Sequence, residues 1–140
     1  MKYIIILLGL FFIFGISSCQ NIVTKEYRNH VVEIYFIPYS ANMFIEMSKQ
    51  DLLKFDLTRK CKISDNDTIN LLIEELNNTM ALGEINESKP DIRVVCLIKL
   101  STNEIFEFCI DHQRYIFVGG RKYQRNAKII EILGLYTGEF

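Results

Sequence analysis

The chain has 140 residues, of which 49% are hydrophobic and 24% are charged, and its formal net charge is −1. This length supports one hydrophobic core and one domain, and the apolar content excludes a mainly disordered chain. The near-neutral charge lacks the basic signature of nucleic-acid-binding proteins, so no nucleic-acid partner is expected.

A secretory leader is predicted at the start of the chain. Lys2 supplies a positive charge, and fourteen residues without a charge follow from Tyr3 to Ile16. A membrane-spanning helix needs about 20 apolar residues, and this run is shorter. The pattern therefore favours a cleaved signal peptide over a permanent span.

The residues Ile16-Ser17-Ser18-Cys19 resemble the lipobox of bacterial lipoprotein signals. The resemblance implies that the Cys19 thiol carries a diacylglyceryl group and that the amine freed by cleavage takes a third chain. Two or more acyl chains hold a protein stably on a bilayer, whereas one binds marginally. The alternative is an ordinary secreted protein with a chance cysteine at the cleavage site.

The lipoprotein interpretation sets the expected domain organisation and location. Residues 1–18 form the signal peptide, residues 19–29 the lipidated cysteine and a polar tether, and residues 30–140 a single α+β domain. The protein is then held on the cell membrane or outer membrane and faces the periplasm or the exterior. Removal of residues 1–18 takes Lys2 with it, which leaves 15 Lys and Arg against 17 Asp and Glu.

The first part of the domain is predicted to contain three strands. The β-branched and aromatic residues of 31–37 predict the first strand, which ends before Pro38. Residues 42–47 (NMFIEM) predict a short second strand, and the spacing of Ser48 and Asp51 predicts one capped helical turn. Residues 57–63 alternate between apolar and polar side chains, which predicts a third, half-exposed strand.

The clearest helix is predicted over residues 65–77, with Ser64 as its N-cap and one apolar stripe at helical spacing. The following segment, 81–91, contains Gly83 and Pro90 and is predicted to be a loop.

Four more strands and a helix are predicted after Pro90. Residues 91–100 and 105–111 form one hairpin, and residues 114–118 and 121–124 form a second hairpin around Gly119-Gly120, a dipeptide suited to a tight primed turn. A last helix begins at the cap Asn126, and Gly134 can stop it. The expected fold is a single antiparallel sheet of short strands in the order β-β-β-α-β-β-β-β-α, with one or two helices packed on a face.

The register of the first hairpin decides the state of two cysteines. With a two- or four-residue loop, Cys96 faces Cys109 and a disulfide is possible. With a three-residue loop, Cys96 faces Ile110 and the two thiols lie on opposite faces. The second register places the apolar residues of both strands on one side and is favoured, so Cys96 is expected to be free and buried, while the disulfide stays an alternative.

Charge is divided along the chain. Between Ser64 and Asp91 seven acids stand against one lysine, whereas residues 112–130 hold five bases and no acid. One interpretation is that these are solvated faces. The sharper hypothesis is that the basic side chains, interleaved with aromatic residues, bind an anionic lipid headgroup, glycan or protein surface; they are Arg114, Arg121, Lys122, Arg125 and Lys128.

Catalytic and metal-binding patterns are weak. Asp111 and His112 lie in a predicted turn with no accompanying nucleophile motif, and a polar turn that serves the chain reversal is the favoured explanation over an acid–base pair. With two histidines and no Cys-x-x-Cys spacing, neither a metal site nor a cofactor is predicted.

The sequence as a whole resembles the small lipoproteins of Bacteroidetes-type bacteria, with short strands and a late Gly-Gly-Arg-Lys-Tyr hairpin before a final helix. This resemblance implies no particular activity. The leading hypothesis is a lipid-anchored, non-enzymatic binding module of the cell envelope. The alternatives are an immunity protein against an envelope-acting toxin and a small envelope hydrolase that uses His112 and Asp111.

Overall fold

The computed structural model describes residues 30–41, 43, 45–84, 90–100 and 103–139. The predicted signal peptide and tether, with Cys19, lie outside these residues. The described chain contains seven strands, which are β1 (Val31–Phe36), β2 (Arg59–Ile63), β3 (Ala81–Glu84), β4 (Ile92–Lys99), β5 (Ile105–Asp111), β6 (Ile116–Val118) and β7 (Arg121–Tyr123). Its helices are α1 (Lys49–Lys54), α2 (Asn66–Asn78) and α3 (Ala127–Thr137).

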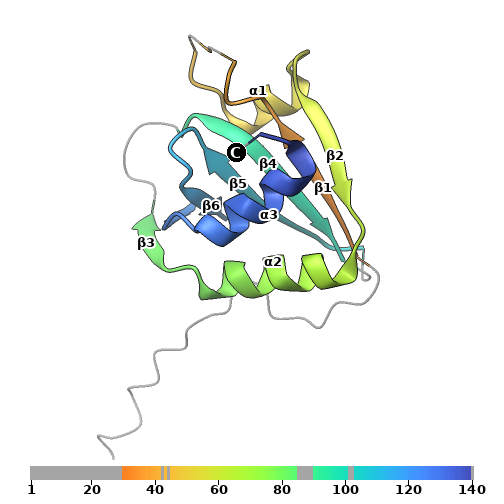
Figure 1. The fold of residues 1–140 in the computed structure, drawn as a ribbon. Helices are drawn as coiled ribbons and strands as arrows, with labels where there is room; N and C mark the ends of the chain where they lie inside the picture. The colour runs from red at the N-terminus through yellow and green to blue at the C-terminus, as the bar shows by residue number, and fades with distance from the viewer. Residues whose placement is uncertain (1–29, 42, 44, 85–89, 101–102, 140) are drawn as a thin grey trace, which may run out of the picture.

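The strands form one sheet in the order β2-β1-β4-β5-β6-β7-β3, and every pair is antiparallel. Figure 1 shows α2 and α3 on the same side of this sheet. The predicted α+β class, with an antiparallel sheet and helices packed on it, is therefore confirmed.

The main core lies between the sheet and these two helices. Alternate residues of β1 and β4, such as Ile34 and Cys96, point toward α2 and α3 and have no exposed surface. The stripe predicted on the first long helix supplies the opposite side, and α3 adds a second stripe; together they contribute Ile69, Leu72, Ile73, Leu76, Ile129, Ile130, Ile132 and Leu133. At about 25 cal/mol per Å² of apolar area, this burial is the main force that holds the layers together.

Helix α2 begins one residue later than predicted. Asp65, not Ser64, is the N-cap, and its carboxylate accepts the Thr68 amide at 2.9 Å. An aspartate cap also places negative charge at the positive end of the helix dipole.

Helix α3 begins after its predicted cap but ends later than predicted. The Asn126 side chain accepts the amides of Lys128 and Ile129 at 2.9 and 3.2 Å. Gly134 does not stop the helix, which continues to Thr137 and ends at Gly138, where φ is 71°. A glycine inside a helix costs only about 1 kcal/mol, so the helix passes through Gly134 and stops where the left-handed conformation is adopted.

The opposite face of the sheet carries a smaller core under α1. The predicted capping box is confirmed, because Ser48 and Asp51 exchange side-chain to backbone hydrogen bonds of 3.2 Å. This second core consists of Ile37, Met47, Leu52, Ile92, Val95, Cys109 and Phe117. It covers part of the face only.

Two of the predicted elements were wrong. In the segment 42–47, the described residues 43 and 45–47 form no strand. The predicted loop 81–91 begins with strand β3, which pairs with β7 at the edge of the sheet. Gly83 has a φ of 126°, and the register shifts between Ala81 and Gly83. Because of this irregularity, the segment lacks the alternation of apolar and polar residues by which a strand is predicted.

The first hairpin has the predicted faces but a different register. Cys96 faces Phe108 instead of Ile110, and Val95 faces Cys109, because the turn is centred one residue earlier than predicted. The last paired residues are Lys99 and Ile105, and the Leu100 amide donates to the Glu104 carbonyl at 2.8 Å. A shift of two residues keeps every side chain on its face. Cys96 is therefore free and buried as predicted, and the Cys96–Cys109 disulfide is not formed.

The second hairpin has the predicted two-residue turn. Val118 faces Arg121, and the intervening Gly119 and Gly120 have φ angles of 54° and 81°. Both angles are positive, as a type I′ turn requires.

Candidate binding surface

The five predicted basic residues divide into separate environments. Arg114 lies in the turn between β5 and β6, Arg121 and Lys122 lie on β7, and Arg125 and Lys128 flank the start of α3. Lys128 forms an ion pair with Glu131 at 3.0 Å. Arg121 lies between Val118 and β3 in the sheet, and no described interaction joins it to the other four.

The turn between β5 and β6 holds Arg114 in a rare backbone conformation. Its amide donates to the Asp111 carbonyl at 2.9 Å, and its φ is 68°. The Asp111 carboxylate fixes the turn by accepting the Tyr115 amide at 2.8 Å. Arg114 is exposed, and its guanidinium carbon lies 5.8 Å from the centre of the Tyr39 ring. A tight turn therefore presents this cation at the surface.

Lys122 and Arg125 meet at one aromatic side chain. Lys122 Nζ lies 3.8 Å from the centre of the Tyr115 ring, and the Arg125 guanidinium carbon lies 4.7 Å from it. Cation–π contacts of this kind hold the two positive charges close together. Burial raises the pKa of the nearby Asp111 carboxyl, while its bond to Tyr115 and the charges of Lys122 and Arg125 oppose that shift.

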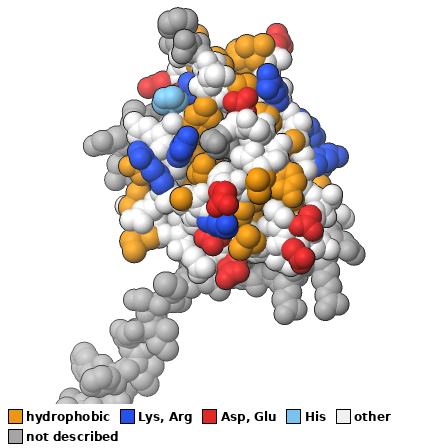
Figure 2. Space-filling view, viewed as in Figure 1, with side chains coloured by type: hydrophobic (Ala, Val, Ile, Leu, Met, Phe, Trp, Pro, Cys, Tyr) orange, Lys and Arg blue, Asp and Glu red, His pale blue; other side chains and the backbone are white. Residues whose placement is uncertain are grey.

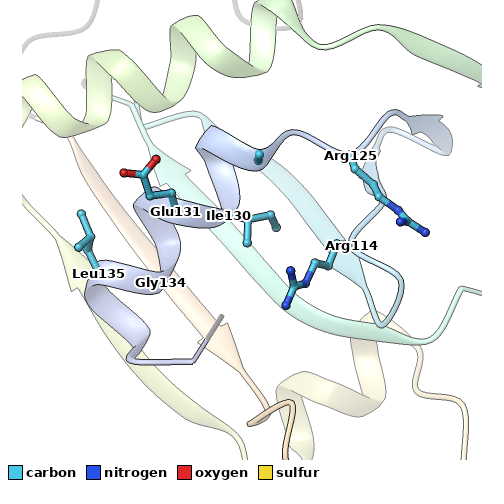
Figure 3. Close-up of a pocket in the computed structure, with 7 residues that line it drawn as sticks. Arg114, Arg125, Ile130, Glu131, Gly134 and Leu135 are labelled. Atoms are coloured by element: carbon cyan, nitrogen blue, oxygen red, sulfur yellow. The ribbon is translucent and has the colours of Figure 1, made fainter.

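Arg114 and Arg125 also line a pocket on the α3 side of the sheet, which has a volume of about 720 Å³. Figure 3 shows both arginines at one end of the pocket, Leu135 at the other end and Ile130 between them. Gly134 contributes no side chain, and Leu135 is 79% exposed. The pocket thus joins a cationic end to a wall of α3 that is apolar apart from Glu131, whose carboxylate pairs with Lys128.

The molecular face that Figure 2 shows has apolar side chains between charged ones, with acidic side chains gathered over its lower part, where α2 runs. The structure thus keeps the division of charge that the sequence indicates. Acidic α2 and the basic segment around α3 lie on one side of the sheet, side by side.

Asp111 and His112 do not form an acid–base pair. The Asp111 carboxylate is engaged by the Tyr115 amide, whereas the His112 ring stacks on Tyr39 with centroids 6.2 Å apart. Within the described chain, no hydrogen bond joins the Asp111 carboxylate to the His112 imidazole. The geometry therefore adds nothing to the hydrolase hypothesis.

Cys109 lines a small pocket of about 210 Å³ beside α1, next to Ile92 and Phe117. Burial raises the pKa of its thiol to about 12. Because the thiolate is the reactive form, this environment is that of an unreactive cysteine.

A second group of charges, which the sequence interpretation missed, surrounds Glu33 on the face that α1 leaves open. Glu33 Oε1 lies 3.0 Å from Lys99 Nζ, 3.2 Å from Lys60 Nζ and 3.8 Å from Lys62 Nζ. The lysines come from β4 and β2, the two neighbours of β1. Only the strand order brings them together, although alternation within β2 already placed Lys60 and Lys62 on one side.

The comparisons with known proteins found no match, so the functional proposal is based on the surfaces described above. No protein-family model matches the sequence, no curated protein matches it, and no solved structure matches the fold. Among the residues that the structure describes, no three histidine, cysteine or acidic side chains gather as a metal site, and no helix is long and apolar enough to cross a membrane.

Proposed function

We propose that this protein is a lipid-anchored, non-enzymatic binding module of the cell envelope, and that its pocket beside α3 binds an acidic, partly apolar segment of a partner protein. The lipobox-like sequence ending at Cys19 supports the anchor. The juxtaposition of Arg114 and Arg125 with the apolar wall of α3 carries the binding proposal.

The arginines suit an anionic ligand. Neither Arg114 nor Arg125 forms an ion pair with a described carboxylate, whereas Lys128 is paired with Glu131. A guanidinium presents several N–H donors in a plane and binds a carboxylate through two parallel hydrogen bonds. A glutamate or aspartate side chain of a partner therefore matches this end of the pocket.

The other end suits an aliphatic side chain. Leu135 is among the most exposed large apolar residues of the described chain, and Ile130 and Ala127 extend the same wall toward the arginines. An apolar residue of the partner that covers Leu135 and fills the space beside Gly134 would remove this surface from water. At about 0.8 kcal/mol per buried methylene, such contacts add affinity to the charge pairing.

Fluorescence anisotropy with a labelled peptide of alternating leucine and glutamate tests the pocket. We expect binding to the wild-type chain, and at least about tenfold weaker binding to an R114G/R125Q variant, because each charge-assisted hydrogen bond contributes about 1.5 to 3 kcal/mol. A K54Q variant is the matched control, since Lys54 is an exposed cation on the opposite side of the sheet. Equal binding of the double variant, or of a leucine–glutamine peptide, would overturn the proposal.

The anchor has its own test, mass spectrometry of the mature amino terminus. A diacylglyceryl group on Cys19 is expected. An unmodified Cys19, or cleavage at another residue, would overturn the anchoring proposal without affecting the pocket.

A further inference from the structure

The open face of the sheet near the start of β1 carries a surplus of positive charge. Three lysines surround the one carboxylate of Glu33, whose side chain is 7% exposed. The neighbouring Lys49 and Glu107 pair with each other at 2.7 Å and add no net charge. The cluster of Lys60, Lys62 and Lys99 around Glu33 therefore presents two uncompensated cations.

The lysine ammonium groups reach solvent while Glu33 holds them in place. The side chains of Lys60, Lys62 and Lys99 are 43%, 61% and 49% exposed. Tyr35 adds to this arrangement, because its hydroxyl donates to Glu33 Oε2 at 3.2 Å and its ring lies 4.7 Å from Lys60 Nζ. The carboxylate thus organises the cations without neutralising them all.

Aliphatic side chains lie beside these cations. Lys99 is flanked in the sheet by Val31 on β1 and Ile105 on β5, and Ile105 is 58% exposed. Lysines next to exposed aliphatic residues are typical of surfaces that lie against anionic lipid headgroups, because the ammonium groups meet phosphates and the apolar groups enter the interface.

The start of the domain lies at the same end of the sheet as Lys99. His30 Nδ1 is 3.1 Å from the Lys99 carbonyl oxygen, which fixes the first described residue beside the cluster. Residues 20–29 separate His30 from Cys19, and ten residues span at most about 33 to 36 Å. If Cys19 is acylated, the anchor joins the domain at this end of the sheet, which keeps the cluster within reach of the bilayer.

We propose that the face around Lys60, Lys62 and Lys99 docks on the anionic headgroups of the bilayer that carries the acylated Cys19. This inference rests on the proposed lipid anchor. The docked domain keeps the pocket beside α3 away from the membrane, since α3 packs on the opposite face of the sheet. The bilayer then positions the binding pocket toward its partner.

Lysine footprinting tests the docking on the full lipidated chain. The protein is reconstituted into vesicles of phosphatidylcholine alone, or with about 30% phosphatidylglycerol as the anionic lipid, and labelled with an amine-reactive reagent. We expect labelling of Lys60, Lys62 and Lys99 to fall about threefold or more with phosphatidylglycerol, and this protection to disappear in high salt. Lys128, on α3 of the opposite face and with its side chain 45% exposed, is the internal control and should label equally in both vesicles.

Vesicle flotation in the same samples separates the two proposals. A chain that floats with both vesicles but labels equally in both is anchored without docking, which overturns this inference and leaves the anchor intact. A chain that floats with neither vesicle overturns both the anchor and the docking.

A variant supplies a second measurement. K62Q/K99Q keeps the pair between Lys60 and Glu33, and circular dichroism checks its fold. Because each lysine near an anionic surface changes binding about fivefold, Lys60 should lose its phosphatidylglycerol-dependent protection in this variant. Retained protection of Lys60 would overturn the inference.

Discussion

Replacement of Glu33 by glutamine should destabilise the protein near neutral pH and have little effect in acid. The hydrogen bond from Lys99 is the largest cause that lowers the pKa of Glu33 from 4.5 to about 2, and burial opposes it. A difference of this size corresponds to about 3 kcal/mol of folding free energy. The three lysines are 43 to 61% exposed, so solvent screens their charges and we expect about 1 to 2 kcal/mol.

The sign of the pH dependence follows from the direction of the shift. Because the pKa of Glu33 is lower in the folded state, the carboxylate stabilises the fold above its ordinary pKa of 4.5, and this stabilisation is lost as the pH falls toward 2. Urea denaturation of the wild type and of E33Q should therefore give midpoints that differ at neutral pH and converge in acid.

A matched control separates the cluster from a general charge effect. Glu131 pairs with Lys128 on the surface and its side chain is 62% exposed, so E131Q should change stability by less than about 0.5 kcal/mol. An E33Q deficit that is equal at neutral and acid pH would refute the electrostatic reasoning, because protonation would then have no part in it.

Other perturbations test the turns and the thiols. R114G should unfold at the same or a slightly higher urea concentration than the wild type, because glycine accepts the φ of 68°, which costs other residues about 1 kcal/mol. A clear loss of stability in R114G would contradict this explanation. G120A should lower stability by about 1 kcal/mol in the same assay, because φ is 81° at Gly120. G119N should leave stability nearly unchanged, because asparagine accepts a positive φ in this turn. Equal effects of the two substitutions would argue against the type I′ turn. Iodoacetamide labelling of the native protein, with the labelled residues mapped by mass spectrometry, should modify Cys61 well before Cys96. Cys61 is partly exposed, whereas complete burial raises the pKa of the Cys96 thiol. The reverse order would contradict the assignment of Cys96 to the core.

Local signals in the sequence were sufficient for most elements of the fold. The capping box of Ser48 and Asp51, the Asn126 cap and the Gly119-Gly120 turn act over a few residues, and each lies where the sequence predicts it. Alternation within β4 and β5 also predicted the buried face of Cys96. These features depend on neighbours along the chain, which a single sequence contains.

Features that depend on distant pairing were not predictable in this way. Strand β3 lies in a segment with Gly83 and is stabilised by β7, about forty residues further along the chain. The loop before Ile105 set a register two residues away from the predicted one. The lysine cluster required the knowledge that β1 lies between β2 and β4.

The candidate pocket was predicted only in part. The sequence indicated the cations Arg114 and Arg125, but not that they share a pocket with α3. Lys128 was assigned to the same surface, yet Glu131 one helical turn later pairs with it. Gly134 was interpreted as a helix stop, whereas it lies inside α3 and lines the pocket.

The two outermost strands have a consequence for association between copies. Within the described residues no further strand pairs with the outer edges of β2 and β3, and an unpaired sheet edge is the usual template for the fusion of two sheets. The five residues of β2 include Arg59, Lys60 and Lys62, so two such edges repel each other, and β3 is short and irregular at Gly83. The protein can therefore be held at high local concentration without its sheets joining edge to edge into aggregates.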